Sequence, residues 1–95
     1  MKQFNDFDDI KVVVHSYGKD ETDSLLKNQI SRLSRTIKQY RLRLMDLKET
    51  LANQTNTDEI RHIQYEIQEY QESVKDHLKR LEKVNGLYID FIQLH

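Results

Sequence analysis

The chain of 95 residues has no cysteine, proline or tryptophan and only two glycines. The lack of cysteine excludes disulfide bonds and thiolate metal sites and fits a reducing compartment, so we expect a cytoplasmic protein. The lack of proline and the scarcity of glycine leave few positions that can interrupt a helix. Long apolar runs are missing as well, since no stretch approaches the roughly 20 apolar residues that a membrane span needs. We therefore expect a soluble chain that does not insert into a membrane.

Apolar residues recur instead along two ladders that alternate spacings of three and four residues. This is the period of a narrow apolar stripe on a supercoiled helix. The residues between the ladders are polar and few, which suits only a connector between antiparallel neighbours. The sequence therefore predicts one all-α domain over 1–95, a long antiparallel helical hairpin of the coiled-coil type. The first ladder comprises Leu26, Ile30, Leu33, Ile37, Tyr40, Leu44, Leu47 and Leu51, and the second comprises Ile60, Ile63, Ile67, Tyr70, Val74, His77, Leu81, Val84, Tyr88 and Phe91.

We predict the first long helix over 21–52, the connector over 53–57 and the second long helix over 58–94. Small polar residues near these bounds have side-chain oxygens that can accept hydrogen bonds from the free amides of a first helical turn. Gly18 allows the chain to reverse ahead of the first helix. The predicted caps are Asp20, Thr22 or Asp23 for the first helix and Thr57 for the second, with Asn53 closing the first helix in a left-handed conformation.

The N-terminal segment 1–19 would pack at the open end of the hairpin, where the two ends of the chain meet. Heptad spacing within it favours a short helix, whereas the β-branched run 10–14 would also suit an extended strand. Either form can cover the open end, so the sequence leaves both readings open. The residues at heptad spacing are Phe7, Ile10, Val14 and Tyr17, and the caps of such a helix would be Asn5 or Asp6.

Pairing the ladders about the connector sets Tyr40 beside Tyr70 and Leu26 near Val84 or Phe91. On this register the second helix outlasts the first by about two turns. Its apolar stripe widens there, so either the first 18 residues or a second copy must cover it. A two-helix seam in so short a chain buries a thin core, and oligomerisation is the usual remedy. We therefore predict a homo-oligomer, in which the contacting residues are Leu87, Ile89, Ile92 and Leu94.

The formal net charge of -1 hides an uneven distribution. Bases dominate the first predicted helix, where Asp46 is the single acid between residues 25 and 48, and the regions before and after are acidic. One explanation is that the helices attract each other across the hairpin, at a few tenths of a kcal/mol per exposed pair. The other is a docking surface. The bases are Lys27, Arg32, Arg35, Lys38, Arg41, Arg43 and Lys48.

The outer side of the first predicted helix carries the candidate binding residues, which gather opposite the ladder at about 100° per residue. An arginine fork makes paired hydrogen bonds, and an apolar residue among bases can anchor a contact, so we expect a protein partner with an acidic patch. The alternative is nucleic acid held by the same bases together with Arg41, although the acidic second helix would repel phosphates. The candidate partner-binding residues are Arg32, Arg35, Lys38, Gln39 and Leu42.

Motifs of catalysis are missing: the sequence has no Gly-rich phosphate loop, nucleophile elbow or zinc pattern. Glu59 and His62 have the Glu-x-x-His spacing of di-metal carboxylate bundles, with Glu66 one turn further, but those sites need two such motifs. His77 takes a ladder position, where a polar side chain more often fixes register than binds a ligand. We therefore predict a protein that is not an enzyme and has no cofactor or metal site.

The segment Tyr65–Glu69 has the spacing of the Tyr-x-x-x-Asp/Glu export signal that is found in small secreted helical hairpins with a Trp-x-Gly turn. The chain departs from that group, because it has no tryptophan and because its tyrosine motif lies inside a predicted helix. We assign no family on this basis. The Asn-, Gln-, Lys- and Ile-rich composition is also typical of small accessory proteins of low-GC bacteria and their phages.

Overall fold

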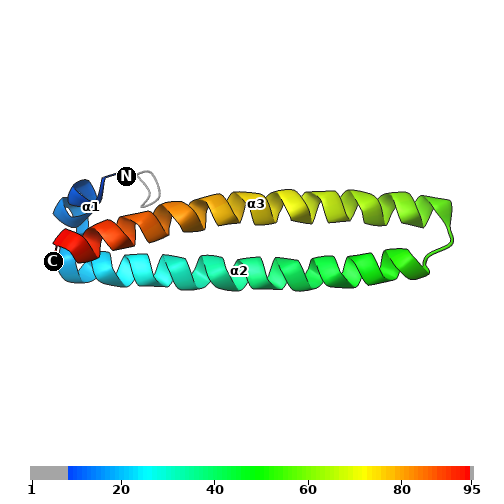
Figure 1. Cartoon of the computed structure of the whole chain (residues 1–95), viewed down its shortest axis with the longest axis horizontal. Coiled ribbons are helices and arrows are strands. Elements are labelled where there is room, and N and C mark those ends of the chain that lie inside the picture. Colours follow the sequence, from blue (N-terminus) through cyan, green and yellow to red (C-terminus); the bar gives the residue numbers. More distant parts are fainter. Residues whose placement is uncertain (1–8, 95) are drawn as a thin grey trace.

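The computed structural model describes residues 9–94 and folds them into the three helices α1 (Ile10–Tyr17), α2 (Lys19–Asn53) and α3 (Thr57–Leu94). The helices α2 and α3 run antiparallel side by side, and the short α1 lies at their open end, near the end of α3 (Figure 1). The molecule extends over 57 × 21 × 17 Å, and the long dimension equals the length of α3 at about 1.5 Å per residue. The predicted all-α antiparallel hairpin is confirmed.

The join between α1 and α2 is tighter than the sequence predicts. Gly18 has φ 85°, a conformation that side chains disfavour, and its N–H donates to the carbonyl oxygen of Val14 at 2.7 Å. Because this residue both ends α1 and reverses the chain, α2 begins at once, with Gly18 as its N-cap and no side-chain cap. The prediction of Asp20, Thr22 or Asp23 as the cap was therefore wrong, and all three lie within the first turns of α2.

The connector is shorter than predicted and covers residues 54–56. Asn56, not Thr57, caps α3, since its Oδ1 accepts from the backbone N–H groups of Asp58 and Glu59 at 2.9 and 3.2 Å. Asn53 does not take a left-handed conformation, because Gly18 is the residue with positive φ within 9–94. Its side-chain amide instead donates to the carbonyl oxygen of Glu49, one turn earlier in α2, at 3.2 Å.

The seam between α2 and α3 follows the predicted register. The rings of Tyr40 and Tyr70 meet edge to face with centroids 5.4 Å apart, and Tyr40 also meets His77 edge to face at 5.3 Å. His77 is half-buried, and its Nδ1 lies 2.7 Å from the carbonyl oxygen of Ser73 in its own helix. The buried apolar residues along the seam away from the open end are Ile37, Leu47, Ile63 and Val74.

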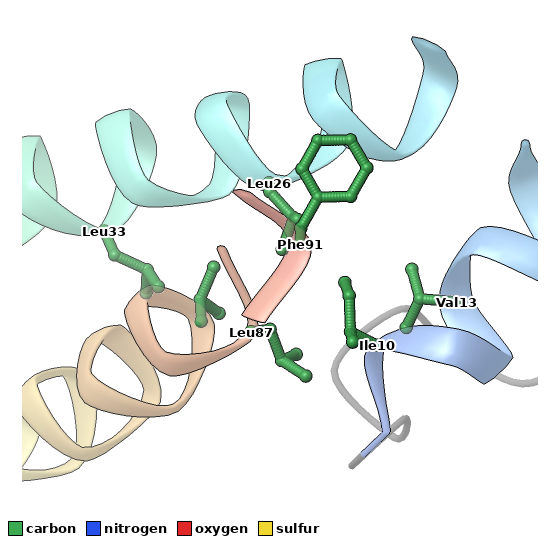
Figure 2. Packing of buried hydrophobic residues seen from close by; sticks show 7 residues of the cluster. Ile10, Val13, Leu26, Leu33, Leu87 and Phe91 are labelled. Atoms are coloured by element: carbon green, nitrogen blue, oxygen red, sulfur yellow. The ribbon is translucent and has the colours of Figure 1, made fainter. Parts of the chain in front are cut away.

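The main core lies at the open end, where α1 joins the two long helices. Ile10 and Val13 of α1 face Leu26 of α2 and the last turns of α3 (Figure 2). This burial decides the open question about the N-terminal segment, because a helix capped by Asp9 and ended by Gly18 places its apolar residues on one side. The proposed heptad position Phe7 and the proposed caps Asn5 and Asp6 lie outside the described residues.

The predicted two-turn overhang of the second helix is wrong. The helix α2 starts at Lys19 and has 35 residues against 38 in α3, so the two helices nearly match in length. Leu87, which we assigned to contacts between copies, is 4% exposed and packs in the main core beside α1. The widened stripe at the end of α3 exists because this helix packs against two neighbours at once.

Candidate functional site

The middle of α2 presents apolar and basic side chains to solvent on the side opposite the seam. Arg35, Lys38, Leu42 and Met45 follow one another at spacings of three and four, so they form a single stripe, which we call the α2 outer face. All four are exposed, and Leu42 and Met45 retain 53% and 66% of their accessible surface. Two adjacent large apolar side chains are thus left uncovered by the fold.

Ion pairs within the hairpin do not account for the basic charge of α2. One salt bridge found among residues 9–94 joins the two long helices, between Arg43 and Glu66 at 3.7 Å. Lys27 pairs within its own helix, with Asp23 at 2.9 Å, and this contact raises the pKa of Lys27. Six bases of α2 have no ion-pair partner in the described part of the chain: Lys19, Arg32, Arg35, Lys38, Arg41 and Lys48.

Two of the predicted binding residues do not belong to the α2 outer face. Arg32 lines a shallow hollow on one side of the seam, together with His77 and Arg80 from α3. Gln39 is exposed and lies seven residues after Arg32, so it is on the same flank of α2 as Arg32. The helical wheel placed all these residues opposite the ladder, but the long Arg32 side chain reaches the groove between the helices.

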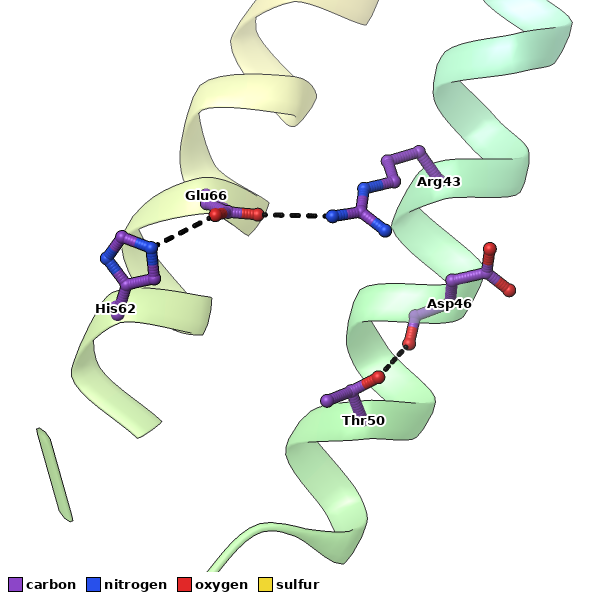
Figure 3. Close-up of polar contacts among 5 residues, drawn as sticks. All are labelled: Arg43, Asp46, Thr50, His62 and Glu66. Carbon is purple, nitrogen blue, oxygen red and sulfur yellow. Dashed lines mark hydrogen bonds and ion pairs between the residues drawn. The ribbon is translucent and has the colours of Figure 1, made fainter. Parts of the chain in front are cut away.

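Of the three residues that had the spacing of a metal motif, His62 and Glu66 form a surface cluster with Arg43, whereas no ion pair in the described part of the chain joins Glu59 to them. The Glu66 carboxylate lies 3.1 Å from His62 Nε2 and 3.7 Å from the Arg43 guanidinium (Figure 3). In the same region the Thr50 hydroxyl donates to the carbonyl oxygen of Asp46 within α2. Across residues 9–94 no three His, Cys, Asp or Glu side chains are grouped so that they could hold a metal ion.

A second tyrosine contact lies beside this cluster. Tyr65 is exposed and lines a hollow with Tyr40, Arg43 and Glu69. The Tyr65 hydroxyl donates a hydrogen bond to the Glu69 carboxylate, and this bond together with the negative charge raises the pKa of Tyr65 above its ordinary value of 10.0. The tyrosine motif is therefore one turn of an α-helix whose two side chains bond to each other.

The predicted oligomerisation residues fall on different sides of α3. Leu87 is buried, while Leu94 is exposed beside α1, where it lines a small hollow with Ile10. Ile89 and Ile92 are 56% and 57% exposed, and Ile89 lines an apolar groove whose other members are Leu78, Leu81, Glu82, Asn85 and Gly86. We call the stripe Leu78, Glu82, Asn85, Ile89 and Ile92 the α3 side face.

Two exposed residues, Met45 and Leu78, lie outside the candidate sites that the sequence predicts. Met45 follows Leu42 at a spacing of three, and this spacing is the sequence signal that the two share a stripe. Leu78 lies at heptad spacing before Asn85 and Ile92, and this spacing is the sequence signal that links it to Ile92. Both residues belong to secondary heptad stripes that run beside the main ladders.

Comparisons with known proteins give no relative: no protein-family model matches the chain, and no curated protein or solved structure is significantly similar to it. None of the helices in the described part of the chain is long and apolar enough to cross a membrane. An extended hairpin with uncovered apolar residues is suited to bind a partner or another copy of itself.

Proposed function

We propose that this protein is a non-enzymatic binding module, in which the α2 outer face docks a protein partner that carries an acidic patch, and that it acts as a homo-oligomer. The observation that supports the proposal is the exposure of Leu42 and Met45 beside Arg35 and Lys38, which have no ion-pair partner in the described residues. An uncovered apolar pair supplies the binding energy, and the charged rim supplies orientation.

The energetic roles of these side chains differ. Leu42 and Met45 gain about 25 cal/mol for each Å² of apolar surface that a partner removes from water. Arg35 and Lys38 lie at the rim, where charge pairs mainly raise the association rate and reject basic partners. We therefore expect loss of Leu42 to speed dissociation, and reversal of charge at Arg35 to slow association in a salt-dependent way.

A nucleic acid is the alternative partner, because the basic side chains of α2 that have no ion-pair partner would contact its phosphates. The observation in its favour is that Arg32 and Arg80 line one hollow between the helices whose lining contains no acid. Two features favour the protein partner. The exposed Leu42 and Met45 have no use on a phosphate backbone, and the acids of α3 lie along the same hairpin.

The test begins with photo-crosslinking in host cells, with a photoreactive amino acid at position 42 and, as a matched control, at position 75 on α3. The protein captured at position 42 alone is then purified and titrated against the variants. Leu42→Ala together with Arg35→Glu should weaken its binding at least tenfold, whereas Gln68→Ala on α3 should leave binding unchanged. Full affinity of the double variant would refute the role of the α2 outer face.

Nucleic-acid binding is measured separately with a random-sequence DNA duplex. If the bases contact phosphates, the logarithm of the binding constant falls linearly with the logarithm of the salt concentration, by about 0.9 for each phosphate contacted. Leu42→Ala would leave this binding unchanged, while Arg32→Gln would weaken it. If the variants show this pattern with DNA and do not change the binding of any captured protein, the partner is a nucleic acid and not a protein.

A further inference from the structure

We infer that two copies of the chain associate through the α3 side face, with their α3 helices antiparallel. The inference rests on the self-association part of the proposed function and is independent of the α2 outer face. Leu78, Ile89 and Ile92 on this stripe are 39%, 56% and 57% exposed. The helix thus carries a third apolar surface, in addition to those that α2 and α1 cover.

The stripe has the spacing of a helix-packing seam. Its members Leu78, Glu82, Asn85, Ile89 and Ile92 alternate spacings of four and three, which keeps them in line along a supercoiled helix. The equivalent positions earlier in α3 are all polar or charged: Arg61, Gln64, Gln68, Gln71 and Lys75. The apolar contact is therefore confined to the last four turns of α3, at the open end of the hairpin.

Gly86 has no explanation within one copy. It lies in a helix interior, where glycine costs roughly 1 kcal/mol relative to alanine, and a Cβ atom built on it would meet nothing within 4 Å. It lines the same groove as Leu78 and Ile89. A second helix that crosses α3 at Gly86 could approach closely because no side chain stands there.

The chemistry of the stripe favours a second copy in the antiparallel direction. Centring the pair midway between Lys83 and Val84 sets Leu78 opposite Ile89 of the second copy and Glu82 opposite its Asn85. Lys79, on the flank of the stripe, then passes over Gly86 of the second copy towards its Asp90. A parallel pair would instead set each Glu82 against its counterpart and each Lys79 against its counterpart, and like charges repel.

The charges that this arrangement joins are available. Lys79 and Asp90 are exposed, and neither has an ion-pair partner in the described part of the chain. Because the arrangement is symmetric, the Lys79 to Asp90 contact forms twice. The contact of Leu78 with Ile89 forms twice as well, so the antiparallel pair joins apolar side chains of the two α3 side faces and opposite charges on their flanks.

Light scattering at about 100 μM gives the first test, with an expected mass of twice the chain mass of 11.5 kDa. Ile89→Ser should give a monomer with unchanged helix content, and Leu42→Ser, an equally exposed control on α2, should remain a dimer. A wild-type monomer at this concentration overturns the inference, and so does a dimer that Ile89→Ser leaves intact. The partner titration of the α2 outer face stands whichever of these results is found.

The absence of cysteine allows the direction of the pair to be tested by disulfide formation. The double variant Leu78→Cys with Ile89→Cys should form a covalent dimer under mild oxidation, because each cysteine faces the other type in the second copy. Each single variant should stay uncrosslinked, since identical residues lie about 16 Å apart along the pair at 1.5 Å per residue. Covalent dimers from the single variants would show a parallel pair and overturn the antiparallel geometry.

Charge reversal tests the flanking contact. Lys79→Glu should weaken dimerisation at least several-fold at low salt, and Lys79→Glu with Asp90→Lys should restore it. Arg61→Glu is a control of equal charge change near the connector, at a position that lies beyond the end of the second copy in the antiparallel pair. Failure of the second substitution to restore dimerisation would overturn the pairing of Lys79 with Asp90.

Discussion

Removal of the Leu26 side chain should destabilise the protein far more than removal of the Leu42 side chain, although both residues belong to α2. Leu26 is 0% exposed and packs in the core where the three helices meet, so Leu26→Ala leaves a cavity that the surrounding helices cannot fill. Such cavities cost about 2–5 kcal/mol. A chain of this size has a total stability of about 5–14 kcal/mol at 0.05–0.15 kcal/mol per residue.

The measurement is thermal unfolding followed by circular dichroism, at one fixed protein concentration for all variants because association with a second copy would raise stability. At about 4–8 °C per kcal/mol for a small domain, a cost of about 2–5 kcal/mol means that Leu26→Ala should lower the melting temperature by roughly 8–40 °C. Leu42→Ala deletes the same atoms from a side chain that is 53% exposed and should change stability by less than about 0.5 kcal/mol. Equal shifts for the two variants would refute the assignment of core and surface.

Three further changes have expected outcomes. Asn56→Ala removes the acceptor at the start of α3 and should cost about 1 kcal/mol in urea unfolding, and no loss would mean that water replaces the cap. His77→Leu should leave the melting temperature unchanged or raised, because the bonded nitrogen contacts only a backbone oxygen of its own helix; a large fall would assign a needed polar contact to His77. Glu69→Gln should lower the pKa of Tyr65 towards 10.0, as followed by NMR of labelled tyrosine. The pKa of Tyr65 is raised in the folded protein, so its contribution to stability is present at neutral pH and is lost as the pH rises through the folded pKa. An unchanged Tyr65 pKa in Glu69→Gln would contradict the hydrogen bond.

The sequence predicts the seam well because heptad spacing determines which side chains face each other. The edge-to-face contact of Tyr40 with Tyr70 follows directly from pairing the ladders about the connector. The ends of the helices are less predictable, since several polar residues near each end could serve as a cap. Gly18 ends one helix and begins the next, and this removed the need for any of the three caps that the sequence offered.

The candidate surfaces were only partly predictable, for reasons of geometry. The β-branched residues of α1 fit a strand or a helix equally, and burial of Ile10 and Val13 against the hairpin decides for the helix. The overhang was counted from Leu26, the first residue of the ladder, whereas α2 begins seven residues earlier at Lys19, and this error grouped Leu87 with Ile89. A helical wheel gives the direction of a Cβ atom but not the reach of a long side chain, so it could not separate Arg32 from the α2 outer face.

The helix α1 thickens the hairpin at one end only, and this makes resistance to local opening unequal along its length. The main core joins three helices at the open end, whereas Leu47 and Ile63 are the buried apolar residues of the described chain nearest the connector. Segments with fewer buried contacts open at lower free energy and exchange their amide hydrogens sooner. Amide protection should therefore rise from the connector towards α1, and the hairpin should unzip from the connector while its open end stays closed. The α2 outer face lies between these extremes, so a partner bound there would slow hydrogen exchange on the connector side more than in the main core.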